Sequence, residues 1–299
     1  MSQKVITVFA PAKINMFLHL TGRLANGYHT LDSLVCFADI GDIIEIEAAH
    51  NFSFHIKGPF AHKFKENEST SFIDGDNLVV RAARALAQIT DMPLNVKITL
   101  TKNLPLASGI GGGSSDAAAT LWGLQEIWSL SHDADYLLPL MTKLGADVPV
   151  CFSCSPQIMR GIGDKITAAP PMPEIPMILV NPMVSCNTQD VFLHHNGKYR
   201  KDKNIPQDVS SQDKLINALK TYDNDLTTPA IQCTASIKNV IYALEATDQC
   251  RIARMSGSGA TCFGLYDTNE QAKQAEESIK SENPDWWVKT GWLNRPERY

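Results

Sequence analysis

The chain has 299 residues, which is more than one small core needs, so we expect two domains. Charged residues make up 20% and apolar residues 44%, as in ordinary soluble proteins, and the net charge of -5 argues against a nucleic-acid binder, which usually has a basic surface. We see neither a signal-peptide pattern nor an apolar stretch long enough to span a bilayer, so we expect a cytoplasmic protein without a membrane partner.

The first stretch predicts two strands, Val5–Ala10 and Pro11–Leu20. In the second strand, Lys13 and Asn15 would project together from one face. A lysine near the start of a strand is usually solvated. From this pattern alone, Lys13 and Asn15 could equally belong to a functional site or to a solvent-exposed face of the strand.

A turn is predicted next, because Asn26-Gly27 supplies positive φ angles. Tyr28 and His29 follow it directly. An aromatic ring and an imidazole at a turn could stack on and hydrogen-bond a planar ring, or they could be ordinary surface residues.

Further along we expect a strand over 42–47, an N-cap at 74–77 for a helix over 78–89, and a strand over 96–100.

Residues 105–124 contain four glycines within five positions, followed by three polar residues at 114–116 that favour a helix start and a helix to about Trp128. A glycine loop that leads into a helix N-terminus favours phosphate binding, and the alternative is a plain flexible loop. The P-loop pattern does not fit, because no Lys-Ser or Lys-Thr pair follows, and the dinucleotide fingerprint fits poorly.

Asp147 lies among apolar residues shortly before Pro149. Because an isolated acid is seldom buried without a partner, it either caps an element or is held in a site. Four prolines within 168–176 then predict a stiff connector, so we expect domains over 1–170 and 171–299. The seven cysteines are odd in number and scattered, and no second Cys/His group lies near Cys151 and Cys154, so we expect reduced thiols and no zinc site.

Three motifs together resemble the GHMP small-molecule kinase superfamily: P-A-K-I-N at 11–15, G-I-G-G-G-S-S-D at 109–116 and M-S-G-S-G-A-T at 255–261. Within it, 11–31, 105–116 and L-G-A-D-V-P at 144–149 are most similar to the 4-diphosphocytidyl-2-C-methyl-D-erythritol kinase family. The resemblance runs from Pro11 to about Tyr266. Ile110 stands where leucine is usual and Ser108 where alanine or glycine is commoner, and we expect neither to disturb the loop.

The resemblance implies an α+β, two-domain GHMP kinase fold, with an N-terminal ribosomal-protein-S5-like domain and a C-terminal ferredoxin-like α/β domain. It implies ATP and Mg²⁺ as cofactors and a small-molecule partner: the enzyme would phosphorylate the 2-hydroxyl of 4-diphosphocytidyl-2-C-methyl-D-erythritol, in the non-mevalonate route to isopentenyl diphosphate. Asp147 would be the general base, and Lys13 would orient it and offset charge. Asp116 and Asp147 both remain candidate Mg²⁺ ligands. We expect a monomer or a weak homodimer.

The resemblance also assigns binding residues. Those that would hold the ATP phosphates are Pro105, Leu106, Ala107, Ser108, Gly109, Ile110, Gly111, Gly112, Gly113, Ser114 and Ser115. Those that match positions near the adenine are Asn77, Val79 and Lys102. Tyr28 and Phe192 would enclose cytosine and His29 would read its polar edge, while Asn15 and Thr188 would place the rest of the substrate. For Phe192 and Thr188, a role in ordinary packing remains an alternative to substrate binding. The 256–259 loop would close the site.

Two rival functions stay open. A homoserine or mevalonate kinase relative would share the glycine loop, but it would have no use for the Tyr28-His29 pair. A non-catalytic nucleotide-binding protein on the same scaffold would not need both Lys13 and Asp147.

Overall fold

The computed structural model describes residues 4–64, 77–131 and 133–295. The strands are β1 (Val5–Arg23), β2 (His29–Ala48), β3 (Ser53–Lys57), β4 (Val96–Thr101), β5 (Gln157–Gly161), β6 (Lys165–Ala168), β7 (Ile175–Asn181), β8 (Ile252–Met255), β9 (Cys262–Leu265) and β10 (Trp287–Leu293). The α-helices are α2 (Leu78–Thr90), α3 (Gly112–Trp128), α4 (Ala134–Leu144), α5 (Val148–Ser153), α6 (Thr188–Leu193), α7 (Gln212–Leu219), α8 (Thr227–Cys233), α9 (Ser236–Ala246) and α10 (Asn269–Glu282). A short 3-10 helix covers Ala61–Lys63.

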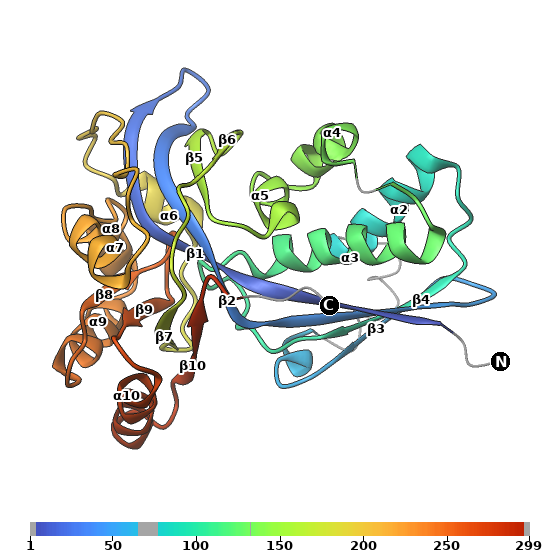
Figure 1. The fold of residues 1–299 in the computed structure, drawn as a ribbon. Helices are drawn as coiled ribbons and strands as arrows, with labels where there is room; N and C mark the ends of the chain where they lie inside the picture. Colours follow the sequence, from blue (N-terminus) through green and yellow to red (C-terminus); the bar gives the residue numbers. More distant parts are fainter. Residues whose placement is uncertain (1–3, 65–76, 132, 296–299) are drawn as a thin grey trace.

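Two unusually long strands, β1 and β2, pair antiparallel and form the centre of the molecule (Figure 1). The two strands predicted over Val5–Ala10 and Pro11–Leu20 are in fact one, because the proline falls at a register shift between Pro11 and Lys13. A bulge tolerates proline, since its residue is not needed in the hydrogen-bond ladder. Gly41 lies opposite Pro11, and a Cβ there would lie 2.3 Å from the Ala10 carbonyl oxygen, so the bulge requires glycine.

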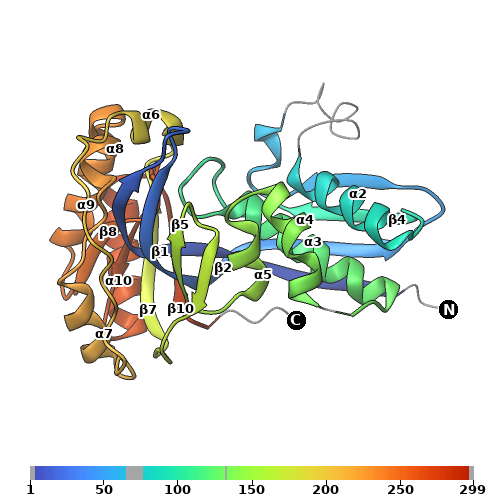
Figure 2. The same cartoon turned by 90° about the horizontal axis from the view of Figure 1, so that it is seen from above.

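The strands form a sheet in the order β3-β4-β2-β10-β7-β9-β8, with β1 and β5 paired to β2 and β6 paired to β5. Helices α2 to α5 lie beside the half that contains β4, and helices α6 to α10 lie around the half that contains β7 to β10 (Figures 1 and 2). This arrangement is the predicted α+β fold. In the described ranges, no helix combines the length and the apolar character that crossing a membrane requires.

The long strands reach from one hydrophobic core into the next. Val8 of β1 packs in a core with α2, α3 and α5, whereas Phe17 packs with residues of β7 and α7, and Leu18 packs with residues of α9 and α10. Strand β1, which carries the first predicted motif, therefore contacts both halves of the chain. The domain boundary expected near residue 170 stays a prediction.

Helix α3 begins two residues earlier than predicted. Its N-cap is Gly111, which has a φ of 62°, and no side chain caps this end. A left-handed angle at the N-cap favours glycine, and it turns the chain sharply into the helix. Ser114, Ser115 and Asp116 consequently lie inside the first turns of the helix. Helix α2 is capped by the Asn77 side chain as expected, while the rest of that predicted cap, 74–76, lies outside the described residues.

Candidate active site

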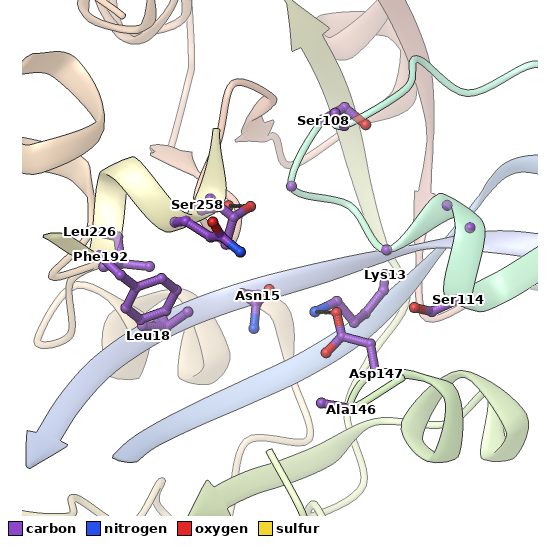
Figure 3. Close-up of a pocket in the computed structure, with 18 of the residues that line it drawn as sticks. Lys13, Asn15, Leu18, Ser108, Ser114, Ala146, Asp147, Phe192, Leu226 and Ser258 are labelled. Atoms are coloured by element: carbon purple, nitrogen blue, oxygen red, sulfur yellow. Dashed lines mark hydrogen bonds and ion pairs between the residues drawn. The ribbon is translucent and has the colours of Figure 1, made fainter. Parts of the chain in front are cut away.

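A cavity of about 1090 Å³ lies where β1, the 105–111 loop, α3, α6 and the loop after β8 meet. Figure 3 shows Lys13 and Asp147 near its middle, Ser114 on the side of α3, and Phe192 and Leu226 toward the other end. Ligand pockets in proteins are commonly about 300–1,000 Å³, so this cavity is at the upper end of that range.

Lys13 and Asp147 form an ion pair at the middle of the cavity, with 2.8 Å between Nζ and Oδ2 (Figure 3). The Lys13 backbone N–H donates to the Ile110 carbonyl, which ties β1 to the glycine loop. Asp147 stands at the N-cap position of α5, yet its side chain caps nothing and turns to the lysine instead. Of the two possibilities left open for Asp147, the structure therefore favours residence in a site.

The glycine loop approaches Lys13 closely. A Cβ on Gly111 would lie 3.1 Å from both Cβ and Cε of Lys13, so a larger residue at this position would press on the lysine. The backbone N–H groups in the first turn of a helix have no partner within the helix, and here they belong to a helix that starts at the cavity wall. An anion at this helix start would meet free donors and the positive end of the helix dipole.

The glycine loop also interlocks with the loop after β8. A Cβ on Gly109 would lie 2.6 Å from the Ser256 and Gly259 carbonyl oxygens, and one on Gly257 would lie 2.6 Å from the Gly109 carbonyl oxygen. The Ser256 hydroxyl donates to the Gly109 carbonyl and accepts from the backbone N–H of Asn15. Because the two loops touch backbone to backbone, each fixes the conformation of the other.

Beneath the start of α3, Lys102 is buried between two carboxylates. Its Nζ lies 2.6 Å from Oδ2 of Asp42 and 2.6 Å from Oδ2 of Asp116. Burial alone would lower the pKa of Lys102, but the Asp116 and Asp42 carboxylates outweigh burial and raise it. Burial raises the pKa of Asp116 well above its usual range, even though Lys102 lies against it.

The far end of the cavity is lined by aromatic and hydroxyl groups. The His29 and Phe192 rings stack with 5.3 Å between centroids, while the Tyr28 side chain is exposed at the cavity wall. The Thr188 and Ser258 hydroxyls lie 2.8 Å apart. Burial lowers the pKa of His29, and nearby Arg23 and His195 lower it further, so all three effects favour the neutral ring.

Asn15, which lines the cavity, has an unused acceptor. Its side-chain N–H donates to the Ser33 hydroxyl at 2.8 Å, which fixes the amide orientation. Its Oδ1 is buried and has no hydrogen-bond partner. An unpartnered buried acceptor is costly, so this oxygen is suited to accept a hydrogen bond from a ligand O–H or N–H group.

Most residues predicted from the resemblance line this cavity, and the exceptions are Val79, Ile110 and Ser115. Val79 and Ile110 are fully buried in the hydrophobic cores, and Ser115 is on the buried side of α3. Lys102 does line the cavity, but its ammonium is held under Gly112 by the two carboxylates.

Sequence reasoning did not assign several further lining residues. They include Leu18, Arg23, Leu31, Phe64, Met159, Ile162, Gln189, Leu193 and Leu226. Most are apolar residues in ordinary strand or helix patterns, so nothing in the sequence separates them from core positions. Gln189 directly follows Thr188, and Arg23 precedes the turn that carries Tyr28 and His29, and this placement was the one available signal.

Comparison with known proteins gives the family. The family model described as "GHMP kinases N terminal domain" matches residues 77–155, and "GHMP kinases C terminal" matches residues 207–285. A 4-diphosphocytidyl-2-C-methyl-D-erythritol kinase from Paramagnetospirillum magneticum is 42% identical over 94% of this chain and 96% of its own length. A kinase of the same name from Sinorhizobium medicae is 43% identical over 95% of this chain and 94% of its own length.

Solved structures agree with this assignment. A crystal structure of 4-(cytidine 5'-diphospho)-2C-methyl-D-erythritol kinase matches with a TM-score of 0.78 and 28% identity, covering 97% of this chain and 100% of that one. Homoserine kinase from Cytophaga hutchinsonii matches with a TM-score of 0.71 at 15% identity, covering 100% and 98%, so it shares the fold. The chain therefore belongs to the GHMP kinases, which are ATP-dependent, and within them to the family of 4-diphosphocytidyl-2-C-methyl-D-erythritol kinases.

Proposed function

We propose that this kinase transfers the γ-phosphate of ATP to the 2-hydroxyl of 4-diphosphocytidyl-2-C-methyl-D-erythritol. The observation that carries the proposal is the Lys13–Asp147 ion pair, which lies in one cavity between a glycine loop at a helix start and a group of aromatic rings (Figure 3). A phosphate donor on the loop side and a cytidyl acceptor on the aromatic side would meet at this pair.

Asp147 acts as the general base in this proposal. Phosphoryl transfer depends on positioning and charge neutralisation, with a base near the attacking hydroxyl. The Asp147 side chain is one-third exposed, so it can reach a substrate, while the Lys13 side chain is almost fully buried and holds it from behind. After taking the proton from the 2-hydroxyl, Asp147 stays beside the ammonium, which also offsets the negative charge on the transferring phosphoryl group.

The triphosphate would lie against the first turn of α3, and Mg²⁺ would accompany it. Mg²⁺ is usually held by one or two carboxylates together with phosphate oxygens and water. Asp116 fits this role, because its Oδ1 is buried, has no hydrogen-bond partner and belongs to a residue that lines the cavity. Bound Mg²⁺ would neutralise phosphate charge. A cation next to Asp116 would also favour the ionised carboxylate, which burial alone disfavours.

The substrate would occupy the other end of the cavity. Tyr28 and Phe192 would stack on cytosine, whose polar edge a neutral His29 can hydrogen-bond. Unpartnered Oδ1 of Asn15 would accept a hydrogen bond from a hydroxyl of the sugar alcohol, and Thr188 would contact the diphosphate portion. This half of the cavity separates the proposal from a homoserine or mevalonate kinase activity.

Phosphorylation assays with three acceptors test the proposal. Purified protein with ATP and Mg²⁺ is offered the cytidyl substrate, homoserine and mevalonate in parallel, and phosphorylated products are identified by mass spectrometry. We expect product from the cytidyl substrate alone. Faster turnover of homoserine or mevalonate would overturn the acceptor assignment, and ATP binding without transfer to any acceptor would favour a non-catalytic protein.

A further inference from the structure

Asp42, a fully buried residue of β2, binds the start of the segment that leads into α3 directly and is linked to α3 through Lys102, and the proposed reaction gives it no role. Its Oδ1 accepts the backbone N–H groups of Asn103 at 2.6 Å and Leu104 at 2.8 Å, where the segment begins. Its Oδ2 accepts from Lys102 Nζ at 2.6 Å, and the same ammonium donates to Asp116 in α3. One carboxylate thus joins the start of the glycine loop to the helix at its end.

The contact with the helix start is close. A Cβ on Gly112, the first residue of α3, would lie 3.3 Å from Lys102 Nζ and 3.8 Å from Asp42 Oδ2. The charged cluster therefore packs directly beneath the backbone whose N–H groups face the cavity. Any side chain at position 112 would therefore press on the Lys102 ammonium.

The charges explain why both carboxylates are needed. Lys102 is almost fully buried, and a buried ammonium is stable only when it is paired and hydrogen-bonded. Asp116 pairs with the ammonium through Oδ2, whereas its Oδ1 has no hydrogen-bond partner, so Asp116 does not bind the loop start. Asp42 does both, with one oxygen for the ammonium and the other for two backbone N–H groups.

We propose that Asp42 is a positioning residue for ATP. It holds the glycine loop and the first turn of α3 in the conformation that receives the triphosphate, and it acts through Lys102 and the backbone without touching the nucleotide. This inference rests on the proposed function, since it assumes that ATP binds at the glycine loop.

The first test compares Asp42→Asn with a matched control, Glu47→Gln. Glu47 also lies on β2 and pairs with Lys97 of β4 at 2.7 Å, but on the solvent side. We expect Asp42→Asn to raise KM for ATP and the Kd for a non-hydrolysable ATP analogue by about tenfold or more, as loss of a charged hydrogen-bond partner implies. KM for the cytidyl acceptor should change less than about twofold, because its half of the cavity does not contact Asp42. Glu47→Gln should leave all three constants as in the wild type.

A second measurement uses the wild-type protein, so it tests the inference even if the Asp42→Asn variant does not fold. Hydrogen exchange should show the Asn103 and Leu104 amides protected before nucleotide is added, because Asp42 already binds them. Rapid exchange of both amides, or an Asp42→Asn protein that binds the analogue as the wild type does, would overturn the inference. Failure of the wild type itself to bind the analogue would instead overturn the proposed function, and the inference with it.

Discussion

Nζ of Lys13 lies 2.8 Å from Oδ2 of Asp147, although the two residues are 134 positions apart in the chain. Lys13 comes from β1, while Asp147 comes from the turn before α5, and the glycine loop lies against the lysine stem. The fold itself thus brings the ammonium and the carboxylate together. Groups that are already in place lower the entropic cost of reaching a reactive geometry.

Replacing Asp147 by asparagine should stop turnover while leaving ATP binding intact. Asparagine keeps the size and one acceptor oxygen but cannot take a proton, and general-base catalysis typically contributes about 10²–10⁴ in rate. Steady-state kinetics with the cytidyl substrate should therefore show that fall in kcat, while the Kd for ATP stays within about threefold. Asp248→Asn, at an exposed acid, is the control. A variant at position 147 with unchanged kcat would refute the base assignment.

Replacing Phe192 by alanine should weaken binding of the cytidyl substrate only. An aromatic pair is worth about 0.5–1.5 kcal/mol beyond the area it buries, so KM for this substrate should rise about tenfold. KM for ATP should not change, because Phe192 lies at the opposite end of the cavity from α3 (Figure 3). Tyr242→Ala removes an exposed aromatic residue elsewhere and serves as the control. Equal effects on both KM values would mean that Phe192 acts by general packing.

The fold class could be predicted because three short motifs resemble those of a known family, while individual elements could be predicted from local patterns. Alternating strands, the Asn77 cap and the glycine run each depend on neighbouring residues. Pro11 was misleading, because a proline usually interrupts a strand, whereas here it sits at a bulge that only the pairing with Gly41 makes possible. Helix α6, with six residues, is too short to give a helical period.

Long-range charge pairing could not be predicted from local pattern. Asp42 begins an alternating segment whose other acids, Glu45 and Glu47, pair with lysines near the surface. Nothing in that pattern separates the one buried carboxylate from the two partly exposed ones. Its role depends on Lys102, which lies 60 positions further along the chain, and on Asp116, which lies 14 positions beyond Lys102. The resemblance places Lys102 near the adenine, and nothing in the sequence indicates that its ammonium lies beneath Gly112 between two carboxylates.

His29 should remain neutral to a lower pH than an ordinary histidine. Burial, Arg23 and His195 all lower its pKa from 6.5, and the rings of Phe192 and Tyr199 also pack around it. As pH falls through 6.5 the unfolded chain therefore takes up this proton before the folded protein does, so the contribution of His29 to stability is present above pH 6.5 and is lost below it. Binding of the cytidyl substrate should likewise hold until a more acidic pH.

An NMR titration of the His29 ring measures this midpoint directly. We expect a midpoint below 6.5 in the wild type, and a midpoint closer to 6.5 in Arg23→Gln, because that substitution removes a neighbouring positive charge. A wild-type midpoint at or above 6.5 would show that His29 is not shielded in this way.

Gly257 should not tolerate alanine, because two separate costs fall on it. Its φ of 55° is strained for any residue with a Cβ, and that Cβ would lie 2.6 Å from the Gly109 carbonyl oxygen. Gly197 isolates the first cost, since it has a φ of 75° and open space around its Cβ position. In denaturant unfolding, Gly197→Ala should lower the free energy of unfolding by about 1 kcal/mol, and Gly257→Ala by about 3 kcal/mol or more. Because the clash pushes on Gly109, the second variant should also bind ATP more weakly. Equal losses of stability in the two variants, with unchanged ATP affinity, would mean that the two loops are not in the close contact that couples β8 to the glycine loop.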